Sequence, residues 1–144
     1  MKTNSCNYKI LKNTKLVLQY YRGKYDIPEA KAMKIQILEA PSYKENSDFI
    51  IDIRDTTISI DFESIKAFSS FVENYLEKNK ISKTAILTSS PSQVANSVTL
   101  FSFLTKHKNY FRVFNSLSAA AQWIGLNSKE EHLAQETLLI LKER

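Results

Sequence analysis

The sequence contains a single cysteine, Cys6, so no disulfide can form within the chain. Disulfides are typical of oxidising compartments, and a chain without them favours a reducing one. No run approaches the roughly 20 apolar residues that a membrane-spanning helix needs. The first residues lead into no apolar segment of the kind found in secretion signals. We therefore expect a cytoplasmic protein without a membrane span.

Glycine is almost as scarce, because Gly23 and Gly125 are the only two in the chain. Phosphate-binding loops of the Walker or dinucleotide type need several residues without a Cβ, where backbone N–H groups approach the phosphates. Two isolated glycines exclude nucleotide-binding enzymes of these types. A Gly-x-Ser-x-Gly segment, which exposes the nucleophile of many hydrolases on a strained turn, is absent as well.

The patterns of metal-binding proteins are also missing. The two histidines, His107 and His132, have no cysteine or histidine at the spacing of zinc ligands, and both are expected in exposed ends of helices. We therefore expect no metal, no cofactor and no catalytic residue, and the chain is predicted not to be an enzyme.

What the sequence does contain is enough apolar surface for one packed domain. The chain has 144 residues, of which 43% are hydrophobic, and it includes eight phenylalanines, seven tyrosines and one tryptophan. This length is typical of a single core. The net charge is +5, and the first 25 residues carry six lysines or arginines and no acid. Charges elsewhere mix both signs, as on an ordinary surface, so the pattern does not favour nucleic-acid binding.

The N-terminal residues predict a β-hairpin. The segments 8–11 and 15–22 are rich in β-branched and aromatic residues, and the turn-like segment 12–14 separates them. In the second segment apolar and more polar side chains alternate, so we expect one face to be more apolar than the other. Gly23 is expected to end this strand.

Helix and strand patterns then alternate along the chain. A helix capped by Asp26 or Ile27 is expected to bury Ala32, Ile35 and Leu38. Further strands are expected at 48–54, 84–88 and 111–114, and further helices at 61–78, from 91 onward, from 116 to 124 and at 128–144. The helix that follows 84–88 is expected to bury Val94, Val98, Phe101 and Leu104 or Thr105.

This order of a hairpin followed by βα units predicts an α/β fold with a mixed sheet of about five strands, flanked by helices and joined by right-handed crossovers. The domain is expected over residues 1–126. Residues 127–144 are expected to form a C-terminal helical extension. Its apolar side chains need a surface to cover, either on the domain or on a second copy, which would make a homodimer.

Two loops that follow predicted parallel strands concentrate polar side chains, at the edge where such sheets usually bind ligands. In the first loop Asp52, Arg54 and Asp55 have two interpretations. The carboxylates could do acid–base work, or Asp52 and Arg54 could close the strand end by hydrogen bonds while Asp61 caps the next helix. The second interpretation is the simpler one.

The second loop places four hydroxyl groups at the start of a helix, where backbone donors and the helix dipole favour an anion such as a phosphate or a carboxylate. Capping of the helix by Ser90 and Gln93 explains the same residues without a ligand. Upstream, the aromatic group of Tyr20, Tyr21 and Tyr25 could line a pocket or pack in the core.

The order of elements, the segment FIIDIRD at 49–55 and the segment RVFNSLSAAAQWI at 112–124 resemble the STAS domain group, and more closely the SpoIIAA-like proteins of bacteria. The resemblance covers about residues 8–126 and implies a mixed sheet flanked by helices. The best-known members are anti-sigma-factor antagonists with a phosphorylated serine at the start of their second helix. Here that position is Phe62, followed by Glu63, so the resemblance implies the fold and a binding role without the phosphorylation.

We therefore expect a non-catalytic regulatory module that recognises a protein partner. The partner-binding residues are expected in one segment after the second parallel strand: Thr57, Ile58, Ser59, Ile60, Asp61, Phe62, Glu63 and Ser64. The alternative is a carrier of a small molecule or lipid, with a pocket at the C-terminal ends of the strands. Its ligand-binding residues would be Thr88, Ser89, Ser90 and Ser92.

Overall fold

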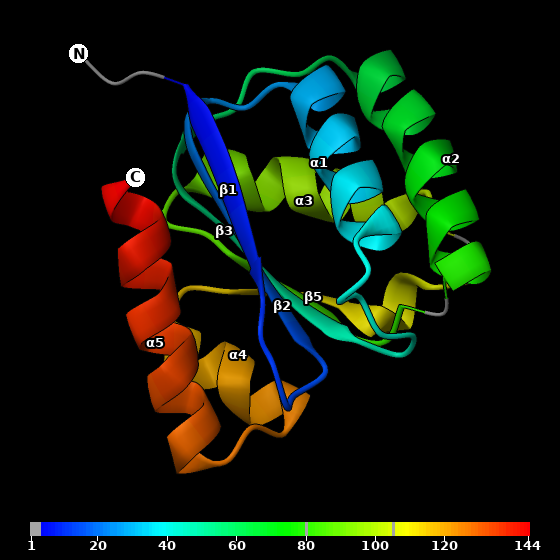
Figure 1. Cartoon of the computed structure of the whole chain (residues 1–144). Helices are drawn as coiled ribbons and strands as arrows, with labels where there is room; N and C mark the ends of the chain where they lie inside the picture. Colours follow the sequence, from blue (N-terminus) through cyan, green and yellow to red (C-terminus); the bar gives the residue numbers. More distant parts are fainter. Residues whose placement is uncertain (1–3, 80, 105) are drawn as a thin grey trace.

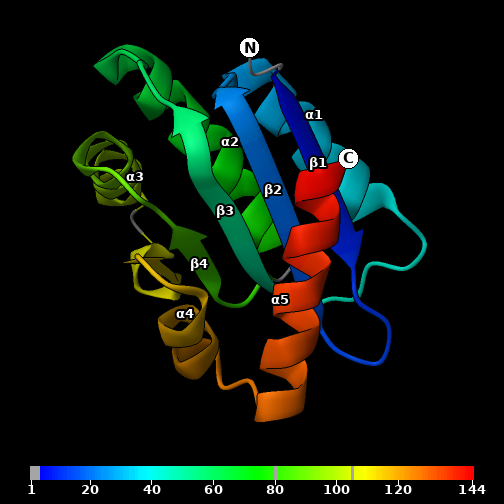
Figure 2. The ribbon, with the colours of Figure 1, turned by 90° about the vertical axis from the view of Figure 1, so that its left-hand side faces the viewer.

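Strands and helices alternate along the chain and form one mixed sheet between two layers of helices (Figures 1 and 2). The computed structural model describes residues 4–79, 81–104 and 106–144. The strands are β1 (Ser5–Ile10), β2 (Leu16–Lys24), β3 (Asp48–Thr57), β4 (Thr84–Leu87) and β5 (Phe111–Phe114). The helices are α1 (Ile27–Glu39), α2 (Phe62–Asn79), α3 (Pro91–Ser102), α4 (Leu117–Ile124) and α5 (Ser128–Glu143), with a 3₁₀ turn at Lys108–Tyr110.

The spatial order of the strands follows the sequence, β1-β2-β3-β4-β5. The first two strands pair antiparallel and the following pairs are parallel, which confirms the predicted hairpin and βα units. Each new parallel strand is added beyond the previous one in the same direction. Right-handed crossovers therefore place α1, α2 and α3 on one face of the sheet, and α4 and α5 cover the other face (Figure 1).

Strand β2 is buried on both faces, including the face that the alternation predicts to be less apolar. Val17 and Tyr21 pack under α1 to α3, while Leu16 and Leu18 pack under α4 and α5. Gln19, which the alternation placed on the polar face, is 0% exposed. The strand lies inside the sheet between β1 and β3, and helices cover both of its faces.

The predicted buried face of α1 is correct only in part. The fully buried residues are Ala30, Met33 and Ile37, whereas Leu38 packs partly buried against the same core, Ile35 is half-buried and Ala32 is exposed. Both sets of residues recur at helical spacing, so periodicity alone cannot choose between them. The position of the helix over β2 decides the choice, because Met33 contacts the buried amide of Gln19 at 3.1 Å.

The predicted buried stripe of α3 is wrong for its first half. Val94 and Val98 are 38% and 53% exposed, and Gln93 and Ser97 are buried instead. The cause is the amide of Gln93, which hydrogen-bonds to β3 and so directs that face of the helix inward. Later in the predicted stripe Leu104 is buried, and Thr105 lies outside the described residues.

Strands β2 and β3 both run further than predicted. Gly23 does not end β2, because it pairs with Thr56 and is followed by Lys24, which pairs with Thr57. The register shifts between Tyr20 and Arg22, and Gly23 has a φ of 86°, a conformation that L side chains rarely adopt. This bulge carries the pair of strands three residues past the predicted end of β3 at Arg54.

Capping residues fix the helix boundaries much as the sequence predicts. Asp26 caps α1 by accepting a hydrogen bond from the Glu29 N–H at 3.0 Å, and Ser116 caps α4 through the Ala119 N–H at 3.2 Å. Gly125 ends α4 with a left-handed φ of 95°. These local rules depend only on residues next to each helix end, so the sequence was sufficient.

Helix α5 packs on the sheet across β1 and β2 (Figure 2). Its buried residues include Leu138 and Leu141, which belong to the same apolar cluster as Leu16 and Leu18. The backbone carbonyl of Leu141 also accepts a hydrogen bond from the side chain of Asn7 at 3.3 Å. None of the helices in the described ranges has the length and apolarity that crossing a membrane requires.

Candidate functional site

The segment predicted to bind a partner spans the end of β3, a four-residue connection and the start of α2. Thr57 is the last residue of β3, residues 58–61 connect, and α2 begins at Phe62. Asp61 caps α2, because its carboxylate accepts the Ser64 N–H at 2.8 Å and the Ser64 hydroxyl at 3.0 Å. These hydrogen bonds lower the pKa of Asp61. The simpler interpretation of Asp61 as a cap is therefore confirmed.

Apolar side chains of this segment differ in exposure. Phe62 is 58% exposed and meets Phe103, at the end of α3, edge to face with ring centroids 5.1 Å apart. Ile58 and Ile60 are half-buried, and both line a cavity beneath α1 to α3. Phe62 is thus the most exposed large apolar group of the segment, while the two isoleucines point toward the interior.

The four hydroxyl groups of the second loop are engaged within the protein. Ser89 donates to the Arg54 carbonyl at 2.8 Å, and Ser92 donates to the Ile58 carbonyl at 3.3 Å. Ser90 caps α3 by accepting the Gln93 N–H at 3.3 Å, and Thr88 has the Phe114 carbonyl as a long contact at 3.5 Å. In this arrangement the hydroxyls fasten the loop to β3 and to the connection that follows it.

Gln93 is a central residue of this region, although the sequence predicts only that it helps to cap α3. Its side-chain N–H groups donate to the carbonyls of Thr56 at 2.9 Å and Arg54 at 3.3 Å, and its amide oxygen accepts the Ser89 N–H at 2.6 Å. A capping box would return that bond to the Ser90 N–H. The glutamine instead joins the start of α3 to the end of β3.

The cluster of acids on β3 forms ion pairs on the α4–α5 side. Asp52 accepts hydrogen bonds from Nε and Nη2 of Arg54 at 3.0 and 2.9 Å. Asp55 accepts the Tyr20 hydroxyl at 2.5 Å and lies 3.2 Å from the Lys142 ammonium of α5. Burial and the bond to Asp55 raise the pKa of Tyr20, and the bond to Asp52 raises the pKa of Arg54.

A polar cleft of about 360 Å³ opens beside these ion pairs, between the sheet and helices α4 and α5. Arg54 and Asp52 form its floor, and Glu131 and Lys142 come from α5. Asp52 is bonded to Arg54, and Asp55 is bonded to Tyr20 and Lys142. The hydrogen bonds between Asp52 and Arg54 agree with the simpler of the two interpretations, in which these residues close the strand end.

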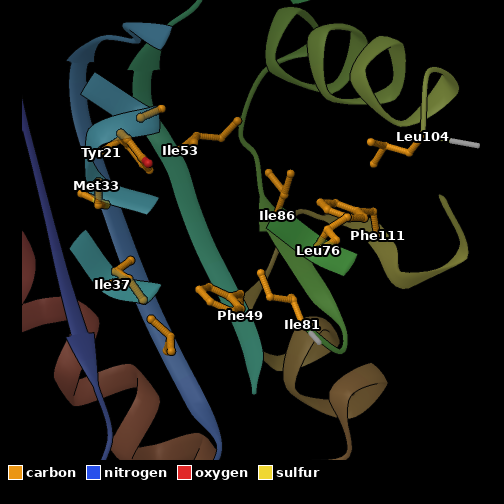
Figure 3. Close-up of a cluster of buried hydrophobic side chains, with 12 residues drawn as sticks. Tyr21, Met33, Ile37, Phe49, Ile53, Leu76, Ile81, Ile86, Leu104 and Phe111 are labelled. Atoms are coloured by element: carbon orange, nitrogen blue, oxygen red, sulfur yellow. The ribbon is translucent and has the colours of Figure 1, made fainter. Parts of the chain in front are cut away.

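A second space, an apolar cavity of about 90 Å³, lies on the opposite face between the sheet and α1, α2 and α3. Figure 3 shows the core around it, with Tyr21 and Met33 on the α1 side and Ile86 and Phe111 on the far side. Most of the lining is aliphatic or aromatic. Tyr21 and Tyr25 line it with ring centroids 5.1 Å apart, so two of the three tyrosines do face a pocket.

The cation of Lys34 lines this cavity, a feature that the sequence pattern did not predict. Lys34 of α1 donates from Nζ to the amide oxygen of Gln19 at 3.0 Å, and its ammonium lies 3.9 Å from the centre of the Phe49 ring. Both partners are fully buried, so the ammonium points inward although the residue as a whole is only half-buried. Burial lowers the pKa of Lys34 to about 7.

The only available signal for Lys34 was its position on the helix. It follows Ala30 by four residues and precedes Ile37 by three, so it shares a helix face with both. Lysine is usually exposed, and the predicted buried face of α1 does not include position 34. The spacing therefore did not indicate a buried lysine before the fold was known.

Cysteine and histidine residues form no metal site in the described ranges, where no group of three or more cysteine, histidine or acidic residues is suitably placed. Burial and the nearby Glu29 raise the pKa of Cys6 to about 12, which keeps its thiol neutral. The expected exposure holds for His132, but His107 is mostly buried, with 17% of its side chain exposed, and lies 3.6 Å from Glu73.

No family model matches the chain, and no curated protein matches it. A solved structure does match, that of an uncharacterized protein of the DUF3478 family with a SpoIIAA-like fold from Shewanella loihica PV-4, with a TM-score of 0.52. The two sequences are 14% identical, and the match covers 85% of this chain and 94% of the other. At this identity the likeness shows the fold, and the predicted SpoIIAA-like fold is confirmed.

Proposed function

Starting from a SpoIIAA-like fold, we propose that this chain is a non-catalytic regulatory module of the cytoplasm that binds a protein partner through the segment from Thr57 to Ser64. The observation that carries the proposal is Phe62, which is 58% exposed at the first position of α2. Large aromatic side chains at such positions are the residue types that contribute most to binding energy in protein interfaces.

The surroundings of Phe62 are suited to an interface because they are held rigidly. Ser92 and Gln93 hydrogen-bond to backbone carbonyls of the connection and of β3, so the segment and α3 form one unit. A rigid surface loses little conformational freedom on binding. Val94 and Val98 of α3 are exposed apolar residues as well, and Glu63 places a charge next to Phe62 in the chain.

The ion pairs on the other face support a role without catalysis. Asp52 pairs with Arg54 within β3, and Asp55 bonds to the Tyr20 hydroxyl and to Lys142. These contacts join parts of the fold, and the pair of Asp55 and Lys142 holds α5 against the sheet.

The substitution Phe62→Asp tests the proposal, with Leu139→Asp as its matched control. Leu139 is 56% exposed on α5, on the opposite face of the sheet. In affinity purification from the native cell followed by mass spectrometry, proteins retained by the wild type and by Leu139→Asp should be lost with Phe62→Asp. Identical sets of proteins with all three baits would refute the proposed surface.

A carrier of small molecules is the second candidate, and the cavity around Lys34 favours it. The hydroxyls of the loop at 88–92 are bonded to the protein's own backbone, so the ligand site of such a carrier would lie under α1 to α3. A homodimer through α5 also stays a proposal, supported by exposed Leu133 and Ile140. Light scattering at two concentrations tests it.

A further inference from the structure

The apolar cavity differs from the rest of the core because it contains a cationic group. Helices α1, α2 and α3 and the sheet line it, and its walls include Tyr21, Ile53, Phe68, Tyr75 and Ile86. Most of the lining is apolar, so the ammonium of Lys34 has few polar partners there.

The hydrogen bonds of Lys34 are also incomplete. An ammonium group carries three N–H donors, and within the described residues Lys34 has one acceptor, the amide oxygen of Gln19. The face of the Phe49 ring accommodates part of the charge at 3.9 Å. Gln19 is itself occupied, because its side-chain N–H groups contact the Tyr21 hydroxyl and the Met33 sulfur, each at 3.1 Å.

None of the described residues that line the cavity carries a carboxylate. The other titratable side chains that line the cavity are Tyr21, Tyr25 and Tyr75, which carry phenol groups. Burial is the cause of the lowered pKa of Lys34, and the cavity lining formed by the described residues offers its ammonium no counter-ion. A buried charge without a counter-ion is costly, and an anion that entered the cavity would remove much of that cost.

We propose that the cavity binds a small apolar carboxylic acid, whose carboxylate accepts the two remaining N–H groups of Lys34 while its hydrocarbon part packs against the apolar walls. The two oxygens of a carboxylate match the two unsatisfied donors. This site is separate from the partner-binding role proposed above, although Ile58 and Ile60 line the cavity from the partner-binding segment. Bound ligand would therefore touch the underside of that segment.

The size of the cavity limits the ligand. An engineered cavity of about 150 Å³ in another protein holds benzene, and this one measures about 90 Å³ but is partly open. Suitable probes are therefore acids with a short chain and no ring. Propanoate and butanoate serve as acids, and 1-propanol and 1-butanol serve as neutral analogues of similar size.

Isothermal titration calorimetry at pH 6.5 provides the first test. The wild type should bind propanoate or butanoate at least about tenfold more tightly than the matching alcohol, since in the acid both the donor and the acceptor of the hydrogen bond are charged, whereas in the alcohol only the donor is. The substitution Lys34→Met should weaken binding of the acids at least about tenfold and leave the alcohols unchanged or tighter. Because the substitution removes a buried charge, the variant is expected to fold, and circular dichroism is the check of its fold.

The matched control is Lys31→Met. Lys31 lies one turn earlier on α1, with its ammonium 5.4 Å from the Phe71 ring, and does not line the cavity. This variant loses the same formal charge from the same helix. Binding of both acids should therefore stay within about twofold of the wild type, since the ammonium of Lys31 lies outside the cavity lining.

The dependence of affinity on pH provides the second test. An acid binds the protonated form of Lys34, so affinity in the wild type should fall by up to about tenfold per unit as the pH rises above 7. In Lys34→Met the affinity should not change over this range. Tyr21 and Tyr25 do not interfere, because burial raises the pKa of both groups.

Three results would each overturn the proposal. These are equal binding of the acids by the wild type and Lys34→Met, binding of the alcohols as tight as that of the acids, and no measurable binding of any probe at millimolar concentration. Alcohol binding alone would show a neutral ligand site in place of an acid site. None of these results bears on the partner surface, which the Phe62→Asp variant tests separately.

Discussion

A buried amide side chain is tolerated when its donors and acceptor are all bonded, and Gln93 meets this condition through three backbone groups. It is 2% exposed and connects α3 to the end of β3. The amide thus does two things at the residue scale. It satisfies carbonyls where β3 leaves the sheet, and it sets which face of α3 points inward.

The substitution Gln93→Ala should lower the free energy of unfolding by about 2–4 kcal/mol, because it leaves buried backbone groups without partners. Urea denaturation measures the change. Asn96→Ala is the control, since Asn96 donates one exposed hydrogen bond to Ser92 within the same helix, and it should cost less than about 1 kcal/mol. Equal losses in the two variants would contradict the role assigned to Gln93.

The two glycines both adopt a positive φ but have different surroundings. A Cβ on Gly23 would lie 2.9 Å from Asn4 Cα, whereas a Cβ on Gly125 would have no atom within 4 Å. Gly125→Ala should therefore cost about 1 kcal/mol from the left-handed backbone alone. Gly23→Ala should cost at least about 2 kcal/mol, because a steric clash adds to the strain. Thermal denaturation of both variants tests the ranking, and the reverse order would contradict it.

At the scale of elements, the strand order determines what α4 and α5 must do. Because successive parallel strands are added in one direction, α1, α2 and α3 all cover the same face of the sheet. The other face would expose Leu16, Leu18 and Ile50 without a further layer. Helices α4 and α5 supply that layer, and Arg22 holds the end of α5 through the carbonyls of Lys142 and Arg144.

Two neighbouring substitutions on α5 test whether this helix is part of the core. Leu141 is 1% exposed and Ile140 is 51% exposed. Leu141→Ala should lower the free energy of unfolding by about 2–5 kcal/mol, because it creates a cavity against the sheet. Ile140→Ala should change it by less than about 1 kcal/mol. If both variants unfold at the same urea concentration, residues 127–144 act as a detachable extension.

For the whole molecule, one buried cation should shape how stability depends on pH. The pKa of Lys34 falls from 10.5 in the unfolded chain to about 7 in the folded protein. Between these values the unfolded chain binds a proton that the folded protein does not, so stability rises with pH. Below pH 7 both states hold the proton, so the folded protein bears the full cost of the buried charge and stability no longer depends on the titration of Lys34.

The wild type should therefore gain stability by up to about 1.4 kcal/mol per unit between pH 7 and pH 8.5, and Lys34→Met should lack this gain. Cys6 has a raised pKa in the folded protein, so its thiol ionises first in the unfolded chain and lowers stability above about pH 9. The upper limit of pH 8.5 keeps the measurement below this range. Urea denaturation at several pH values provides the comparison. Parallel curves for the two proteins would contradict the buried position of the ammonium.

Much of the fold followed from the sequence because it depends on local rules. Capping by Asp26 and Ser116 and termination by Gly125 involve only neighbouring residues, and the order of elements restricts the topology. The candidate sites followed less well. Asp61 was foreseen as a cap, but Gln93 and Lys34 act through residues that are distant in the sequence.

The sequence by itself determined the number, type and order of the elements, since hydrophobic period and capping residues are properties of short segments. Only the tertiary structure decided which face of α1 and of α3 is buried, because two apolar faces of similar spacing compete and the contact with the sheet selects one. That selection turned Lys34 inward and Val98 outward. The candidate ligand site therefore exists because of packing between elements, which no short segment encodes.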